Sequence, residues 1–259
     1  MKKIFTATLM LCLCCVAAMA VTTAQRADSA YNKEDYREAI RLYEQSLAED
    51  GRSSTVYYNL GNAYYRHDNV GKAVLSYERA LRLNPTNADA RQNLEFVKGR
   101  IQDRPEDDSS FFSNMHRGIV ASCTADSWAW IAFGVFICFA GAAALYMFTN
   151  NVTLRKTGFF GGLVLLVLFI YVLCVASDAS ATAQSHEEAV VTVPGTQLSS
   201  APRAARTSAD KVVTIHEGTK VEIVDSVATP DDPVSPKWYE VKINNSTRAW
   251  LRSSDVERI

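Results

Sequence analysis

The sequence lacks the residue groupings on which most catalytic and metal sites depend. None of its histidines has metal-ligand spacing to another histidine or to a cysteine, and they are scattered over four regions: His67, His116, His186 and His216. A Gly-rich phosphate loop and a Gly-x-Ser-x-Gly turn are both missing. We therefore expect no catalytic residue, no metal site and no cofactor, and we expect that the protein is not an enzyme.

The sequence also lacks an excess of either charge and a set of cysteines for disulfides. The 27 basic and 28 acidic residues leave a net charge of −1, which gives no electrostatic footprint for nucleic acid. Of the six cysteines, three precede residue 16 and two lie in uncharged apolar runs, so only Cys123 remains. These absences exclude a nucleic-acid-binding protein and a disulfide-rich secreted domain.

Two long stretches, 128–149 and 158–177, contain no charged residue at all. A helix that crosses the hydrocarbon core of a bilayer, ~30 Å thick, needs about 20 apolar residues. Both stretches meet this length and predict two transmembrane helices; the alternative is a buried hairpin of core helices. Gly158 and Gly162 have the four-residue spacing that lets helices approach closely, so we predict that they lie at a helix-packing surface.

The N-terminus and the loop between the two stretches predict the orientation of the chain. Residues 1–20 combine a basic start, an apolar run and small residues, as in a signal peptide; whether it is cleaved stays open. The loop 150–157 carries Arg155 and Lys156 and no acid, so the positive-inside bias places it in the cytoplasm. Both flanking regions then lie on the periplasmic side of a bacterial inner (cytoplasmic) membrane.

Residues 21–104 contain an internal repeat with a period of 34 residues. A shift by this period places Ala39 on Ala73 and Tyr43 on Tyr77 without a gap. The second copy, at about 54–87, carries the eight positions of the tetratricopeptide pattern: Tyr57, Leu60, Gly61, Tyr64, Ala73, Tyr77, Ala80 and Pro85. The pattern predicts two helices per copy, with small residues where the helices approach most closely.

The other copies are less complete. In the first copy, about 20–53, Arg26 stands in place of the leucine of the pattern and Gly51 in place of its proline. A third half-copy begins at Asn87, where we expect a single capping helix. The prediction is therefore a stack of five helices.

Tetratricopeptide stacks bind extended peptides or partner helices on their concave face. Alternate positions of the first helix of each copy line that face, and they predict these partner-binding residues: Tyr31, Tyr58, Asn62, Tyr65, Arg66 and Gln92. Asp28, Asn32 and Phe96 continue the row. Asn62 falls where carboxylate-binding members keep an asparagine, but the accompanying lysines are missing. The alternative is that all of these are ordinary solvated helix positions.

Two segments, 105–127 and 178–188, are predicted to be linkers. The first is acidic and then polar, and its Phe111, Phe112 and Met115 are expected to form a short amphipathic stretch on the membrane. The second is rich in alanine, serine and threonine and shows no periodicity.

Residues 189–259 change to the alternating pattern of short β-strands. The segments Ile215–Val221, Trp238–Val241 and Ala249–Leu251 resemble the turn and the two tryptophan strands of bacterial SH3-like domains. The resemblance implies a small all-β barrel with aromatic side chains in a shallow groove: Trp238, Tyr239 and Trp250. The alternative for the two tryptophans is packing in the core. The predicted fold class is thus a multi-domain α + β membrane protein.

The whole order of segments resembles that of the BatE-type proteins of bacterial Bat (aerotolerance) operons. This resemblance implies a scaffold that works with von Willebrand A-type Bat membrane proteins and a MoxR-type AAA ATPase in stress tolerance. It carries over no catalytic residue. Two functions follow: a non-enzymatic scaffold for protein–protein interactions in an envelope complex or, as the alternative, a protein that senses or binds peptidoglycan or a stem peptide through the SH3-like barrel.

Overall fold

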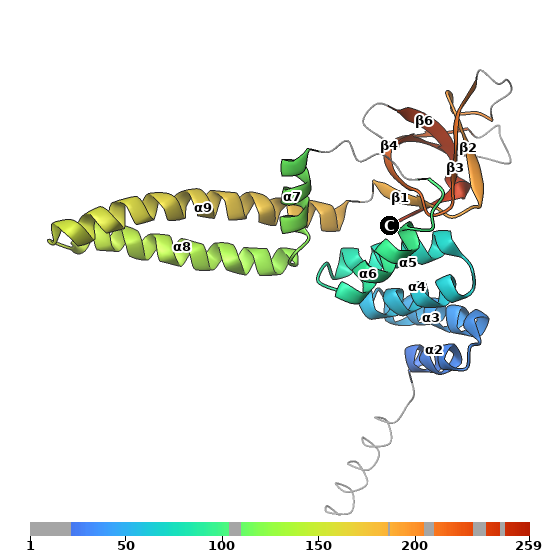
Figure 1. Ribbon diagram of the computed structural model, residues 1–259, viewed down its shortest axis with the longest axis horizontal. Coiled ribbons are helices and arrows are strands. Elements are labelled where there is room, and N and C mark those ends of the chain that lie inside the picture. Colours follow the sequence, from blue (N-terminus) through green and yellow to red (C-terminus); the bar gives the residue numbers. More distant parts are fainter. Residues whose placement is uncertain (1–21, 104–109, 186, 205–209, 230–236, 244–246) are drawn as a thin grey trace, which may run out of the picture.

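The computed structural model describes residues 22–103, 110–185, 187–204, 210–229, 237–243 and 247–259 (Figure 1). It contains a stack of short helices, a long helical hairpin and an antiparallel sheet, which makes the fold α + β. The hairpin projects away from the other two parts, which lie against each other. The predicted signal peptide and the acidic residues of the first linker lie outside the described residues.

Five helices form the stack, as predicted: α2 (Thr23–Asn32), α3 (Tyr36–Asp50), α4 (Ser54–Arg66), α5 (Val70–Leu83) and α6 (Ala88–Lys98). Each begins behind a polar side chain whose oxygen accepts a backbone N–H of the first turn: Thr22, Asp35, Ser53, Asn69 and Asn87. Glu34 and Asp68, at equivalent places in the two copies, adopt positive φ angles of 62° and 61° in the turns between helices.

The closest approach inside the second copy is at Gly61, as the repeat pattern predicts. A Cβ on Gly61 would lie 2.7 Å from Cε1 of Tyr77, so α4 and α5 touch through the bare backbone and a tyrosine ring. Tyr77, Ala73 and Leu60 are buried there. Burial of these apolar surfaces holds the stack together, because no single copy can cover its own apolar face.

The two apolar stretches form the long helices α8 (Ala125–Phe148) and α9 (Val152–Gln184), which pack as a hairpin. Both are long and apolar enough to cross a membrane, by length and composition. Their side chains are mostly exposed, with 6% and 17% of the most apolar windows buried. This exposure contradicts the alternative of a hairpin buried in a soluble core.

Helix α9 extends beyond the predicted span at both ends. Asn151 caps its start by accepting from the backbone N–H groups of Thr153 and Leu154, so most of the predicted loop 150–157 is helical. At the other end the helix continues to Gln184, so most of the predicted linker 178–188 is helical too. Helix α7 (Phe111–Val120) lies within the other predicted linker. The segment 178–184 is thus helical although its sequence shows no apolar periodicity.

The sheet contains seven antiparallel strands: β1 (Glu188–Val191), β2 (Gly195–Ser199), β3 (Lys211–His216), β4 (Lys220–Ala228), β5 (Lys237–Lys242), β6 (Arg248–Arg252) and β7 (Val256–Arg258). Their order across the sheet is β3-β2-β6-β5-β4-β1-β7. Its core is formed mainly by aliphatic side chains from alternate strand positions, among them Leu198, Ile215, Val221, Val241 and Leu251.

The sheet is not closed into a barrel, which corrects the prediction. Strands β3 and β7 end the order, and no pairing joins them among the described residues. Closure depends on pairing between distant strands, which the alternation within each strand does not specify. Helix α5 contacts β7 through Arg79, whose Nη2 donates to the main-chain oxygen of Arg258 at 2.6 Å. This bond occupies one main-chain acceptor of an edge strand.

The sheet packs directly against the stack, a contact that the sequence did not predict. A Cβ on Gly71 of α5 would lie 2.8 Å from the main-chain oxygen of Val191, so α5 and β1 meet backbone to backbone. Val190 is fully buried and belongs to the hydrophobic core of the stack. The two outer parts of the chain therefore form one packed body rather than two separate modules.

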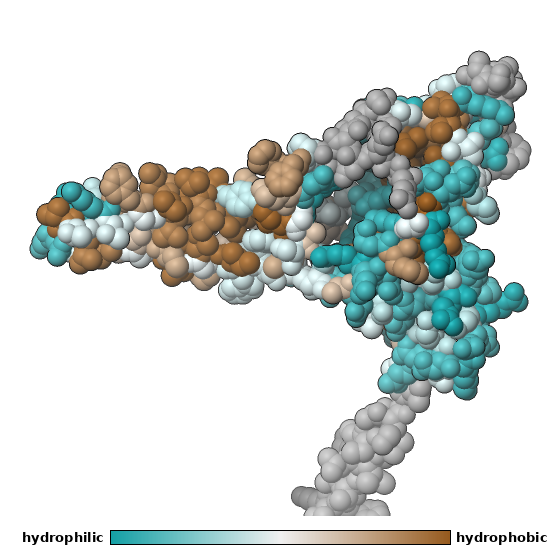
Figure 2. Space-filling view, in the orientation of Figure 1, coloured by the Kyte–Doolittle hydropathy of each residue, from teal (hydrophilic) through white to brown (hydrophobic). Residues whose placement is uncertain are grey.

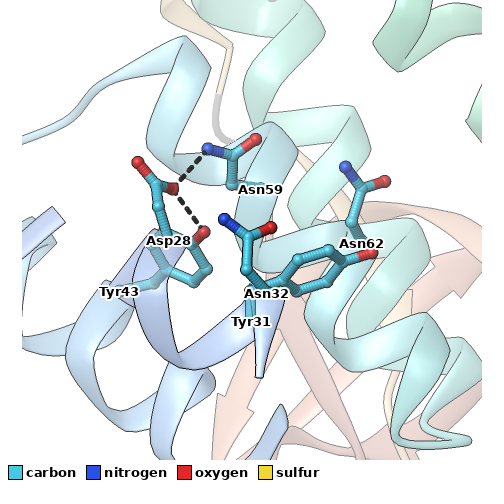
Figure 3. Close-up of a pocket in the computed structure, with 6 residues that line it drawn as sticks. All are labelled: Asp28, Tyr31, Asn32, Tyr43, Asn59 and Asn62. Atoms are coloured by element: carbon cyan, nitrogen blue, oxygen red, sulfur yellow. Dashed lines mark hydrogen bonds between the residues drawn. The ribbon is translucent and has the colours of Figure 1, made fainter. Parts of the chain in front are cut away.

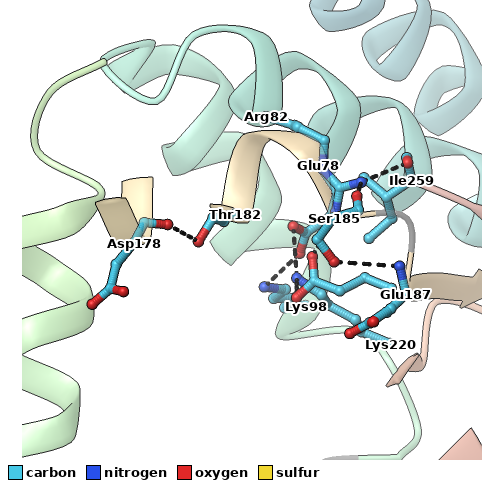
Figure 4. A network of polar contacts seen from close by, with 10 residues as sticks. Glu78, Arg82, Lys98, Asp178, Thr182, Ser185, Glu187, Lys220 and Ile259 are labelled. Atoms are coloured by element: carbon cyan, nitrogen blue, oxygen red, sulfur yellow. Dashed lines mark hydrogen bonds and ion pairs between the residues drawn. The ribbon is translucent and has the colours of Figure 1, made fainter. Parts of the chain in front are cut away.

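A network of charged side chains lies at this contact (Figure 4). The Glu78 side chain is 11% exposed, and its carboxylate lies 3.1 Å from Lys98 Nζ and 3.3 Å from Lys220 Nζ. Lys220 Nζ also lies 2.9 Å from the Glu188 carboxylate. Burial alone would raise the pKa of Glu78, but the two lysines outweigh it and hold this pKa below its ordinary value.

Arg82 connects the end of α9 to the same contact (Figure 4). Its Nη1 donates to the main-chain oxygens of Ser185 at 2.5 Å and Ile259 at 2.7 Å. Its Nη2 donates to the Glu188 carboxylate at 2.8 Å. One arginine of α5 thus contacts the residue after α9, the first strand and the residue after the last strand.

Candidate functional site

The candidate site is a pocket at the end of the stack that lies away from the sheet (Figures 1 and 3). Its volume is about 400 Å³, and its lining comes from α2, α3 and α4: Asp28, Tyr31, Asn32, Tyr43, Asn59 and Asn62. The lining combines one carboxylate, three amides and two phenols. Such a surface offers both donors and acceptors beside flat apolar rings.

Asp28 organises one side of the pocket (Figure 3). Its Oδ1 accepts a hydrogen bond from the Tyr43 hydroxyl at 2.6 Å and another from Asn59 Nδ2 at 3.1 Å. The three residues come from three different helices. Their hydrogen bonds therefore fix the positions of α2, α3 and α4 relative to one another at the pocket.

The same triad recurs one repeat later. Asn62 Oδ1 accepts from the Tyr77 hydroxyl at 2.7 Å and from Asn93 Nδ2 at 2.8 Å. In both triads the donors lie 15 and 31 positions after the acceptor. The chemical difference is that the acceptor is a carboxylate in the first copy and an amide in the second. Because Asn62 Oδ1 already accepts two hydrogen bonds, the group that Asn62 can offer to a ligand is its NH₂ donor.

Both tyrosines of the triads remain neutral donors at ordinary pH. Burial raises the pKa of Tyr43, and its hydrogen bond to Asp28 raises it further. Burial likewise raises the pKa of Tyr77. The hydroxyl protons therefore stay in place, and the geometry of the pocket does not change with pH through either phenol.

Residues 25–88 match the model of the tetratricopeptide repeat family. The chain contains tetratricopeptide repeats. The matched segment covers most of both 34-residue copies and ends where α6 begins, so α6 is an additional helix that stacks on the second repeat. The pocket is lined by α2, α3 and α4, all of which lie within the matched repeats.

The structure brings together some of the predicted partner-binding residues. Tyr31 and Asn62 line one pocket, and half-buried Tyr58 packs on Tyr77 with ring centroids 6.2 Å apart. Tyr65 lies further along the tetratricopeptide stack, where its ring meets the edge of Phe96 at 5.8 Å. Their role in binding stays a prediction.

The remaining predicted positions are exposed and lie outside the pocket lining. The Arg66 guanidinium lies 5.2 Å from the centre of the Tyr36 ring, where a cation is attracted to the π face. Arg100 lies in the same way over Tyr65, at 5.3 Å. Gln92 is exposed on α6. The tetratricopeptide face is therefore aromatic and basic along one part and polar around Asp28.

Sequence reasoning left out Tyr43, Asn59 and Asn93, because the pattern assigns the binding face to alternate positions of the first helices. A signal for them exists in the sequence. The 34-residue shift that aligns Tyr43 with Tyr77 also aligns Asn59 with Asn93 and Asp28 with Asn62. Polar residues that recur with the repeat period at positions between helices are expected to bond to one another.

The predicted groove of the sheet is not formed by its three aromatic residues. Trp238 is 2% exposed, so it cannot stack on a ligand, which corrects its predicted place in an open groove. Its Nε1 is buried and has no hydrogen-bond partner among the described residues. Trp238 is therefore buried, as the packing alternative requires, but on the face opposite the hydrophobic core of the sheet.

Tyr239 and Trp250 lie on opposite faces of the sheet. Strand pairing places Trp250 opposite Glu240, so it shares a face with Trp238, whereas Tyr239 points to the other face. Tyr239 packs against the sheet core, with Lys237 and Arg258 each 5.2 Å from its ring centre. One shallow groove cannot include all three rings.

The two glycines predicted for helix packing differ in their surroundings. A Cβ on Gly158 would lie 2.8 Å from Tyr146 N and 2.9 Å from Ala142 O, so the backbones of α8 and α9 touch there. A Cβ on Gly162 would meet the Ala142 Cβ at 3.7 Å, an ordinary contact. Within the described parts of the chain, no three histidine, cysteine or acidic residues are grouped as metal ligands.

Proposed function

We propose that this protein is a membrane-anchored, non-catalytic scaffold whose tetratricopeptide face binds an extended segment of a partner protein. The observation that carries the proposal is the pair of hydrogen-bonded triads centred on Asp28 and Asn62. They hold polar groups in fixed positions beside the aromatic rings of a pocket. Preorganised groups of this kind lower the entropic cost of binding a flexible peptide.

The anchoring part of the proposal rests on α8 and α9. Their apolar side chains are exposed over more than the ~20 residues that a bilayer crossing needs. Arg155 and Lys156 near the hairpin tip favour a cytoplasmic tip. With this orientation the repeats and the sheet both lie on the periplasmic side of the inner membrane.

The finer assignment is to a BatE-type scaffold, with von Willebrand A-type Bat proteins and a MoxR-type ATPase as its complex. Its support is the order of repeats, apolar hairpin and sheet along the chain. Peptidoglycan binding has less support, because Trp238 is buried and Tyr239 and Trp250 lie on opposite faces.

The test is site-specific photo-crosslinking of the full chain in its native membrane. A photo-reactive residue in place of Arg66 lies on the tetratricopeptide face, and one in place of exposed Arg37 on α3 is the matched control. We expect a protein adduct at position 66 that weakens when Tyr31 is changed to alanine. Equal adducts at both positions, or none at position 66, would contradict the proposed binding face.

A further inference from the structure

Helix α7 has an apolar side that is largely exposed in the described structure. At about 100° per residue, its large apolar side chains share an arc of roughly 100°: Phe111, Phe112, Met115 and Ile119. Phe111 and Phe112 are each 74% exposed and Met115 is 49% exposed. The polar side chains Ser113, Asn114 and Arg117 lie on the opposite side of the helix.

The orientation of this helix is fixed by contacts with both long helices. His116 Nε2 lies 2.9 Å from the Asp178 carboxylate of α9, and its ring meets the edge of Tyr171 at 6.2 Å. Trp128 Nε1 of α8 donates to the main-chain oxygen of Val120 at 3.4 Å. These contacts use a third side of α7, between its apolar and polar sides.

The position of α7 relates its apolar side to the apolar surface of the hairpin. Figure 1 shows α7 crossing α9 at a steep angle, at the level where α8 begins. Figure 2 shows apolar side chains on α7 close to those of the long helices. Tyr171, whose ring meets His116 of α7, is 42% exposed, and Trp130, in the second turn of α8, is 73% exposed; aromatic residues are enriched at membrane interfaces.

We propose that α7 lies in the interface of the outer leaflet, with Phe111, Phe112 and Met115 at the boundary of headgroups and acyl chains. The occupant of its apolar side is lipid, because that side continues the lipid-facing surface of α8 and α9. This placement rests on the proposed membrane anchoring. It gives α7 a membrane-binding role beyond connecting the repeats to the hairpin.

The proposal also places the repeats relative to the membrane. Arg91 Nη2 of α6 donates to the main-chain oxygen of Ala121, directly after α7, at 3.1 Å. Ser185, directly after α9, is held by Arg82 of α5. The stack is therefore attached, through α5 and α6, to the residues that directly follow α9 and α7.

Spin labels on the full chain in phospholipid vesicles test this placement. In a background with the six native cysteines replaced, single labels are placed at Phe112→Cys and, as the adjacent control on the polar side, at Ser113→Cys. A third label at Ile137→Cys on exposed α8 reports whether the hairpin lies in the bilayer. Relaxation by oxygen measures contact with lipid, and relaxation by a water-soluble nickel chelate measures contact with water.

We expect oxygen to relax the labels at 112 and 137 several-fold more than nickel does, with 112 nearer the surface, and we expect the reverse at 113. A label at 112 that behaves like the one at 113 overturns the proposal. A label at 112 that is shielded from both reagents also overturns it, because a protein then covers this side. If the label at 137 is water-exposed, the membrane anchoring itself is wrong and the placement of α7 falls with it.

Discussion

The two triads show how single residues position the tetratricopeptide helices. Each triad joins three helices through one oxygen atom that accepts two hydrogen bonds. The acceptor is Asp28 in one repeat and Asn62 in the other, so the second triad shows which substitution the first should tolerate. An amide oxygen can accept the same two bonds as the carboxylate.

This comparison leads to a prediction for Asp28. We expect Asp28→Asn to change the free energy of unfolding by less than about 1 kcal/mol, because both donors keep an acceptor. Asp28→Ala leaves the hydroxyl of Tyr43 and the amide of Asn59 without their partner, and we expect it to cost roughly 1–3 kcal/mol. Denaturant unfolding of the detergent-solubilised chain measures both. Equal losses would show that the charge, not the hydrogen bonding, is what the repeat needs.

The close contact of Gly61 with Tyr77 leads to a second prediction. Gly61→Ala places a methyl group within 2.7 Å of the buried Tyr77 ring, which cannot move freely, so we expect a loss of roughly 1–3 kcal/mol. The control is Gly118→Ala in α7, where a Cβ meets nothing within 4 Å. There the better helix propensity of alanine should stabilise the helix by up to about 1 kcal/mol. If Gly61→Ala lowers the free energy of unfolding no more than Gly118→Ala does, the close approach at Gly61 does not limit stability.

In the hairpin, the spacing of two glycines indicates which face of α9 packs on α8, but it does not indicate which glycine lies at the closest approach. Gly158 and Gly162 are equivalent by spacing, but α8 and α9 approach each other most closely at Gly158. We expect Gly158→Ala to destabilise the hairpin and Gly162→Ala to leave it intact. The measurement is the distance between labels on α8 and α9 in detergent. A larger effect at position 162 would place the contact elsewhere.

The sequence predicted the elements well where a period or an uninterrupted apolar run specified them. The 34-residue repeat predicted five helices, and the charge-free stretches predicted the two long ones. The helical end of α9 was missed, because residues 178–184 have no apolar face of their own. The structure stabilises this end from outside, through His116 on Asp178 and Arg82 on Ser185.

Neither the open sheet nor the hydrogen-bonded triads were predicted from the sequence, and the physical reason is the same for both. Both depend on contacts between residues far apart in the chain, such as the pairing of Val191 with Val256. Strand alternation indicates which residues face the core but not which strands lie at the edges. Tyr31 and Asn62, by contrast, were predicted from alternate positions of the first helices, and the structure brings both into the lining of one pocket.

For the whole molecule, the important contact is that between the stack and the sheet, in which the Glu78 carboxylate is buried beside two lysines. Glu78→Gln removes the charge that balances Lys98 and Lys220, and we expect it to cost roughly 3 kcal/mol. Glu38→Gln is the matched control, because Glu38 pairs with Arg41 on an exposed surface of α3, where solvent screens the pair, and its loss should matter much less. Tryptophan fluorescence during denaturant unfolding measures both. Similar small losses would show that the contact does not depend on this network.

The same contact should depend on pH in a defined direction. Burial alone would raise the pKa of Asp103, but hydrogen bonds from His216 and Thr219 outweigh it, so this pKa is lowered, as is that of Glu78. A carboxyl with a lowered pKa stabilises the folded state above its ordinary pKa of about 4, and this stabilisation is lost as pH falls further. Burial would lower the pKa of Lys220, but Glu78 and Glu188 raise it, so its contribution is complete below about pH 10 and lost above.

We therefore expect the stack and the sheet to separate on acidification to about pH 3 while the repeats remain helical. The distance between one label on α5 and one on β4, followed together with circular dichroism, measures this separation. The control is Glu78→Gln, which should show a smaller pH response because one of the responsible carboxyls is gone. A distance that does not change down to pH 3 would contradict the expectation.

The placement of Lys220 also has a consequence for how the protein is made. Glu78 meets this partner 142 positions later in the chain, after the entire hairpin. Chains are synthesised from the N-terminus at roughly 5–20 residues per second, and early domains fold first. For several seconds the new repeats therefore hold a Glu78 carboxylate that has Lys98 beside it but still lacks its second lysine, Lys220. Over that interval the nascent protein offers chaperones and proteases a surface that the finished protein no longer shows.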